Sequence, residues 1–238
     1  MHASVSSGSP VVSRRHLEVL LGGIASLALV VGSWQRLIPY SLTETLGFVT
    51  GAVCVYLVVK ESVWNFPVGL ANNFFFIILF ANARLFGDAA LQVVYIALGI
   101  QGWYLWLYGG RNRTALKVAR APARLLIILS VLTLVVTIGL ALVLRRVRGS
   151  LPILDSLTTV LSLAAQYLLN KKYFENWYAW ITADLIYVYI YVSKGLHLTA
   201  ILYLVFLGLC LAGVRSWWVA LRKKQTGATP LRLKGAIP

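Results

Sequence analysis

Acidic side chains are scarce in this chain. Only 7 of its 238 residues are Asp or Glu, against 22 Lys or Arg, and charged residues of both signs make up 12% of the chain. Hydrophobic residues make up 59%. A soluble domain of this length carries a larger share of charged residues, so the composition excludes an ordinary soluble protein and indicates a polytopic membrane protein.

Histidine and cysteine are also scarce, with 3 His and 2 Cys. The histidines are scattered and form neither a metal-binding spacing nor a pair with a nucleophile, so we expect no enzyme activity, no metal and no cofactor. Cys54 and Cys210 lie in apolar runs and are expected to pack as small side chains without a disulfide. There is no Gly-rich loop ending in Lys-Ser or Lys-Thr, which argues against ATP-driven pumping by this chain.

Long apolar runs are abundant. A helix needs about 20 mostly apolar residues to cross the hydrocarbon layer, and it satisfies its own backbone hydrogen bonds there. The sequence therefore predicts an all-α polytopic membrane protein with eight transmembrane helices. The segments that qualify, some of them loosely, are 17–34, 42–59, 67–84, 88–108, 124–144, 152–169, 177–193 and 198–218.

The basic residues indicate the orientation. If the spans alternate, 16 Lys and Arg lie on one side of the membrane and 6 on the other. The richer side is expected in the cytoplasm together with both termini, although Arg145, Arg146 and Arg148 lie on the opposite side. The net charge of +15 is thus assigned to topology and to anionic lipid headgroups of the bilayer, and no nucleic acid partner is expected.

An internal repeat organises the spans. A shift of 111 residues aligns 44–106 with 155–217 without a gap and pairs Asn65 with Asn176 and Trp106 with Trp217. One span separates the two three-span repeats, so equivalent helices cross in the same direction, as in SWEET-like transporters with parallel repeats. The predicted parts are a disordered N-terminus (1–16), an extra helix (17–34), a first repeat (40–110), a linker helix (124–144), a second repeat (152–218) and a basic cytoplasmic tail (219–238).

One face of segment 177–193 carries polar and aromatic side chains. Trp177, Trp180, Asp184, Tyr187 and Tyr191 follow one another in steps of three and four residues. An aspartate at mid-membrane costs about 2.5–3.5 kcal/mol, so it marks a functional site by default, with a structural hydrogen bond as the alternative. An interfacial aromatic belt would also explain the residues near the ends. Rings around a carboxylate favour a planar organic cation.

The first repeat carries amides in the matching region. Asn73 is the counterpart of Asp184, and such amides either bind neighbouring helices or bind a ligand's carboxamide and hydroxyl groups. No span has Lys or Arg near its centre, which disfavours a phosphorylated ligand. The predicted substrate-binding residues are Asn72, Asn73, Gln92, Tyr95, Gln101, Trp106, Trp177, Trp180, Asp184 and Tyr187.

Three short runs carry a family resemblance that covers about residues 40–218. The runs are 67–76 (PVGLANNFFF), 101–110 (QGWYLWLYGG) and 176–180 (NWYAW), the last followed by Asp184, Tyr187, Tyr191, Lys194 and Gly195. In this order and spacing they resemble the PnuC family of bacterial nicotinamide riboside transporters. The resemblance implies a SWEET-like three-plus-one-plus-three fold in the cell inner membrane, facilitated diffusion of nicotinamide riboside, and a cytoplasmic riboside kinase that traps the vitamin.

Several alternatives stay open at this point. Related transporters carry thiamine or riboflavin, and short aromatic motifs discriminate poorly among these vitamins. A non-transporting membrane receptor would have the same helices. We expect alternating access between the two three-helix bundles, with proton coupling through Asp184 less favoured because no second acid or histidine accompanies it. A homo-oligomer is neither indicated nor excluded, and the extra first span has no place in the resemblance.

Overall fold

The computed structural model describes residues 14–82, 86–146, 151–193 and 197–226. Over these residues the chain is all-α, as the sequence predicts, with an isolated β-bridge between Ala119 and Tyr173 as its only strand-like pairing. The elements are α1 (Arg14–Trp34), α2 (Leu42–Val59), α3 (Asn65–Asn82), α4 (Phe86–Tyr108), the 3-10 helix η1 (Arg111–Arg113), α5 (Ala123–Arg146), α6 (Pro152–Asn170), α7 (Asn176–Ser193) and α8 (His197–Thr226).

Six of the described helices, α2 to α6 and α8, are long and apolar enough to cross a membrane. Helix α1 contributes only the shorter apolar stretch Gly22–Trp34. Helix α7 has the length of a span, but its asparagine, aspartate and aromatic residues lower its mean hydropathy. The prediction of eight spans therefore stays a prediction for α1 and α7.

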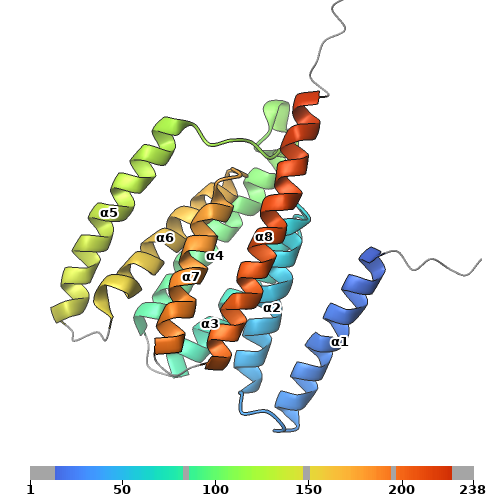
Figure 1. Cartoon of the computed structure of the whole chain (residues 1–238), viewed down its shortest axis with the longest axis vertical. Coiled ribbons are helices and arrows are strands. Elements are labelled where there is room, and N and C mark those ends of the chain that lie inside the picture. Colours follow the sequence, from blue (N-terminus) through green and yellow to red (C-terminus); the bar gives the residue numbers. More distant parts are fainter. Residues whose placement is uncertain (1–13, 83–85, 147–150, 194–196, 227–238) are drawn as a thin grey trace, which may run out of the picture.

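Six helices form a closed ring of neighbours. Helix α2 packs on α3, α3 on α4, α4 on α6, α6 on α7, α7 on α8, and α8 returns to α2. Outside the ring, α5 packs on α6 and α1 packs on α2, and Figure 1 shows these two helices on opposite flanks. Helix α5 exposes large apolar side chains along its length, among them Ile127, Val131 and Leu134, as expected for a lipid-facing connector.

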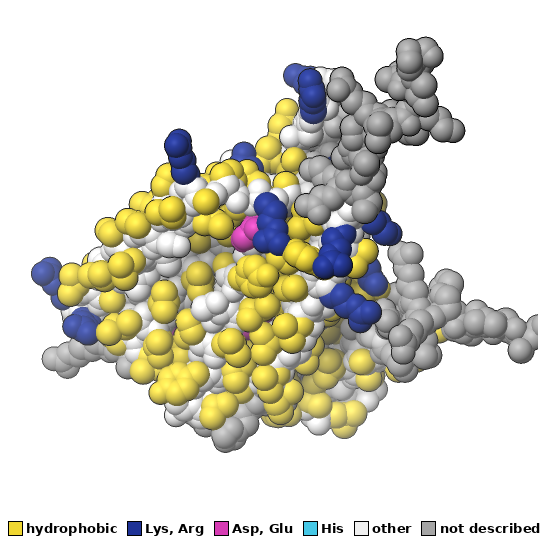
Figure 2. Space-filling view, turned by 45° about the horizontal axis from the view of Figure 1, so that its top comes forward, with side chains coloured by type: hydrophobic (Ala, Val, Ile, Leu, Met, Phe, Trp, Pro, Cys, Tyr) yellow, Lys and Arg dark blue, Asp and Glu magenta, His cyan; other side chains and the backbone are white. Residues whose placement is uncertain are grey.

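The surface separates into apolar flanks and one basic end. Figure 2 shows hydrophobic side chains over the flanks, while most Lys and Arg side chains gather toward the end that faces up in the view. We call this end, formed by residues 60–64, 109–122 and 171–175 with the last turns of α8, the basic end. A belt of apolar side chains below a basic rim is the surface expected of a membrane protein.

Residues 111 positions apart make matching contacts. The indole N–H of Trp106 donates to the carbonyl of Leu169 at 3.0 Å, and the indole N–H of its counterpart Trp217 donates to the carbonyl of Val58, also at 3.0 Å. These acceptors are themselves counterparts. Such paired contacts are what an internal repeat requires, because equivalent residues then occupy equivalent environments.

Two predicted boundaries differ from the structure. Helix α1 begins at Arg14, so residues 14–16 are helical where a disordered N-terminus was predicted, and residues 1–13 lie outside the described residues. Helix α8 continues to Thr226, well past the predicted end at 218, because Leu221 is buried against the aromatic core of the basic end. The rest of the predicted tail, and Arg84, Arg148, Lys194 and Gly195, lie outside the described residues.

Candidate functional site

Asp184 lies inside the bundle. Its relative exposure is 6%, while Tyr178, Leu185 and Tyr189 form the exposed face of α7. The thiol of Cys210 on α8 donates to Asp184 Oδ2 at 3.5 Å. A thiol is a weak donor and brings no positive charge, and no Lys or Arg in the described part of the chain forms an ion pair with this carboxylate. The structure therefore leaves a buried carboxyl group that has no cationic partner among the described residues.

Aromatic rings from α7 and α8 lie beside this acid. The ring centroids of Tyr187 and Tyr203 are 4.6 Å apart, those of Tyr191 and Tyr203 are 5.2 Å apart, and Phe206 meets Tyr203 edge-on at 5.9 Å. Tyr203 and Phe206 were not among the predicted site residues. The repeat alignment could have found them, since a shift of 111 residues places them on Gln92 and Tyr95.

Helix α6 adds hydroxyl groups that sequence reasoning missed. Thr158 and Ser162 are buried at 1% and 5% exposure, one helical turn apart. The hydroxyl of Tyr187 lies beside both of them, and that of Tyr95 on α4 lies beside Ser162. Tyr95, Tyr187 and the two α6 hydroxyls thus come from three helices and meet within one region of the bundle.

The matching region of the first repeat lacks these hydroxyls. The counterparts of Thr158 and Ser162 are Gly47 and Gly51 on α2. A Cβ atom at Gly47 would lie 3.3 Å from Phe76, and one at Gly51 would lie 3.5 Å from Phe206. Around α2, the rings of Phe76 and Phe206 therefore lie beside glycines. Their counterparts Tyr187 and Tyr95 lie beside the α6 hydroxyls, so the interior of the helix ring is chemically asymmetric.

The amides predicted for the site have different surroundings. Asn72 donates to the carbonyl of Gly47 and to the Thr50 hydroxyl, the latter at 3.0 Å, so its amide joins α3 to α2. Asn73 and Gln92 are half-buried, and their amides make no hydrogen bond to other described residues. Asn72 thus matches the alternative role of interhelical contact, while the Asn73 and Gln92 amides have no hydrogen-bonding partner among the described residues.

The remaining predicted residues lie toward the basic end. Trp106 and Trp177 are each only 1% exposed and pack with Trp217, Trp177 meeting it edge-on at 5.4 Å. Trp180 packs against the same core and is half-buried. Gln101 is exposed and accepts a hydrogen bond from Asn170 at 3.5 Å. In this conformation Trp106 and Trp177 are buried in the hydrophobic core, and the same core contains Cys210, the hydrogen-bonding partner of Asp184.

Two surface hollows lie elsewhere on the protein. One of about 390 Å³ is lined by residues of the α1–α2 turn, including Arg36 and Tyr40. The other, of about 320 Å³, lies between α7 and α8 and includes Arg215 and Trp218. Neither contains a predicted site residue. No group of three or more metal-binding side chains occurs among the described residues.

Comparison with known proteins relates this arrangement to a family. The nicotinamide mononucleotide transporter family model matches residues 41–219. The nicotinamide riboside transporter PnuC of Escherichia coli is 27% identical over 214 residues, covering 79% of this chain and 90% of that protein. The riboflavin/roseoflavin transporter RibM of Streptomyces davaonensis is 25% identical over 189 residues, covering 76% of this chain and 86% of that protein.

A solved structure has the same fold. The crystal structure of the vitamin B3 transporter PnuC superposes with a TM-score of 0.66 at 21% identity and covers 85% of this chain and 92% of that chain. The family model spans α2 to most of α8 and leaves α1 outside the match. This chain therefore belongs to the nicotinamide mononucleotide transporter family, and it is a PnuC-type membrane transporter and not an enzyme.

Proposed function

We propose that this protein carries nicotinamide riboside across the bacterial inner membrane by facilitated diffusion. The observation that carries the proposal is Asp184, buried beside tyrosine rings with no cationic partner among the described residues. A buried carboxylate without a partner is unfavourable, and a pyridinium cation would balance it. The relatives named as nicotinamide riboside transporters support the same substrate.

The chemical asymmetry of the interior suits the parts of this substrate. The pyridinium ring would lie near Asp184 with its face toward Tyr187 or Tyr203, since cation–π contacts add to the electrostatic attraction. The ribose would meet the hydroxyls of Tyr95 and Ser162. The carboxamide would pair with a side-chain amide such as Asn73, because amides both donate and accept.

Alternating access between the two repeats is the proposed mechanism. The matching contacts of Trp106 and Trp217 join the two halves at one end, which is the arrangement expected when two similar bundles rock about a central site. We place the basic end in the cytoplasm on the charge distribution. Uptake would then be driven by the substrate gradient, maintained by a cytoplasmic kinase.

Uptake into proteoliposomes tests the proposal. We expect wild-type protein to equilibrate labelled nicotinamide riboside and Asp184→Asn to bind it at least about tenfold more weakly, which corresponds to about 1.4 kcal/mol. Tyr187→Phe should also weaken binding, whereas Tyr189→Phe on the exposed face of the same helix should not. Normal binding and uptake by Asp184→Asn would refute the site assignment. Binding without uptake would instead indicate a receptor.

Riboflavin is the second candidate substrate because the similarity to RibM extends over most of both chains. Riboflavin has no positive charge, so it would leave Asp184 unbalanced. Calorimetric titration with nicotinamide riboside, its mononucleotide, thiamine and riboflavin separates the candidates. A riboflavin response without a nicotinamide riboside response would replace the first proposal with the second.

A further inference from the structure

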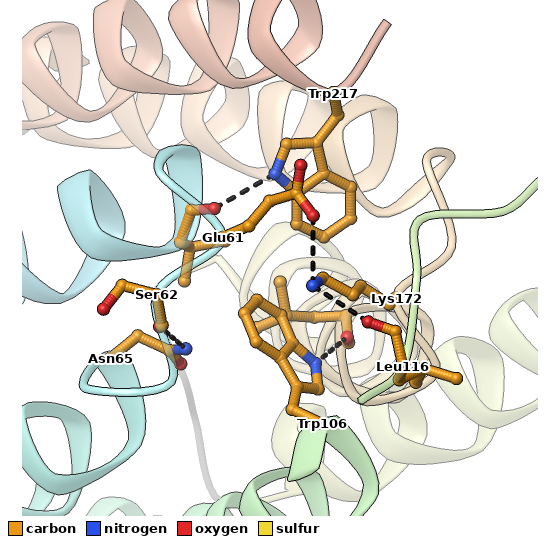
Figure 3. A network of polar contacts seen from close by, with 9 residues as sticks. Glu61, Ser62, Asn65, Trp106, Leu116, Lys172 and Trp217 are labelled. Carbon is orange, nitrogen blue, oxygen red and sulfur yellow. Dashed lines mark hydrogen bonds and ion pairs between the residues drawn. The ribbon is translucent and has the colours of Figure 1, made fainter. Parts of the chain in front are cut away.

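An ion pair at the basic end joins two residues that are counterparts of each other. Glu61 lies in the turn between α2 and α3, and Lys172 lies 111 positions later in the turn between α6 and α7. Lys172 Nζ is 3.0 Å from Glu61 Oε2. Figure 3 marks this ion pair with a dashed line. Because Glu61 belongs to the first repeat and Lys172 to the second, this ion pair lies at the interface between the two repeats.

The backbone at both positions would favour glycine. Glu61 and Lys172 each have φ 55°, in the left-handed region. Each follows the end of a helix, and the next amide closes the turn, Ser62 N–H on the carbonyl of Leu57 and Tyr173 N–H on that of Leu168, both at 2.9 Å. This is the helix C-terminal motif in which glycine is the usual residue. Long charged side chains are present here against that preference, which points to a role for them.

Lys172 is held firmly by groups of the first half and its linker. Its side chain is 8% exposed, and its ammonium group also donates to the Leu116 carbonyl at 3.1 Å and lies 4.4 Å from the centroid of the Trp106 ring. The Glu61 side chain is 30% exposed. Figure 3 shows the Trp106 and Trp217 indoles near the ion pair, each with the hydrogen bond that crosses between the halves.

We propose that Glu61 and Lys172 are further functional residues of transport and form the gate at the basic end. The gate is closed in this structure, and the two side chains separate when the passage opens on that side. This inference rests on the proposed alternating access. The pair suits a gate because the Glu61 side chain is partly exposed, so water and lipid headgroups can stabilise its carboxylate once Lys172 moves away.

Distance measurement between the two turns tests the gate without any substrate. Spin labels would be placed at Trp64→Cys and Lys171→Cys in a background with Cys54→Ser and Cys210→Ser. We expect two populations of molecules, one with a long and one with a short distance between the labels. Glu61→Gln and Lys172→Met should each raise the long-distance population about tenfold relative to the short-distance one. The double variant should add little to either single change, because both remove the same interaction. Arg120→Gln, which removes the ion pair with Glu175 at the same end, should leave the distances unchanged.

The outcomes separate this inference from the proposed substrate. Longer distances in both single variants, with a non-additive double variant, support the gate even if nicotinamide riboside does not bind. Unchanged distances in folded variants that still transport nicotinamide riboside would overturn the gate and leave the substrate proposal intact. Additive effects of the two variants would also overturn it. Counterflow of the labelled substrate by Glu61→Gln should change at least about threefold from wild type if the gate governs exchange.

Discussion

Gly213 on α8 is the position where the packing of the basic end can be tested most directly. A Cβ atom there would overlap the Trp177 indole, and Gly213 has no positive φ, so closeness of approach is its only requirement. Trp177 cannot easily give way, because it is 1% exposed and wedged edge-on against Trp217. We therefore expect Gly213→Ala to destabilise the protein.

Gly208 on the same helix provides the matched control, since a Cβ atom there meets nothing within 4 Å. Replacing a helical glycine with alanine gains up to about 1 kcal/mol of helix propensity at either position. Forcing an extra methyl group into a packed core costs about 1–3 kcal/mol. Gly208→Ala should thus be neutral or stabilising, and Gly213→Ala should be less stable than Gly208→Ala by about 1–3 kcal/mol.

Unfolding in mixed micelles with increasing SDS, followed by circular dichroism, measures this difference. Gly102→Ala should behave like Gly213→Ala, because its Cβ atom would lie 2.6 Å from Phe66 and overlap Asn170. If Gly213→Ala proves as stable as Gly208→Ala, the close contact between α7 and α8 does not exist as described. Equal stability of all three variants would refute the packing of both repeats.

Three other substitutions test individual contacts. Asn72→Leu should lower the free energy of unfolding by about 0.6–2 kcal/mol, measured by the same SDS titration, because it removes the hydrogen bonds from α3 to α2. Trp217→Phe removes the bond to Val58 and leaves a cavity where the buried indole was, so it should lower this free energy by more than about 1 kcal/mol; no change would refute the packing of Trp217 as well as the bond. Arg120→Gln should change the free energy of unfolding by less than about 1 kcal/mol, because the arginine side of its ion pair with Glu175 is largely exposed. A larger loss would show that the stacking of Arg120 on Phe174 and Trp218 contributes more than the ion pair.

The sequence alone determines the class of protein and the positions of most helices. Backbone N–H and C=O groups find no hydrogen-bonding partner in lipid. Apolar runs of this length therefore form helices, whichever neighbours they pack against. The same physics makes Asp184 a candidate site residue from the sequence alone, because a carboxylate in an apolar span is unfavourable unless it has a partner or a function. The repeat is also visible in sequence, since Trp106 and Trp217 or Gly102 and Gly213 coincide under one shift.

Only the tertiary structure decides which neighbour each side chain meets. Asn72 and Asn73 are adjacent and chemically alike, yet the rotation of α3 against α2 gives hydrogen-bonding partners to Asn72. Trp106 and Trp177 look like site residues on their own helices, and packing between helices places them in the core. Glu61 and Lys172 are 111 residues apart, and no local pattern pairs them. The rotation of each helix and the contacts between distant turns depend on how all the helices pack together. The hydropathy of a single segment does not predict them.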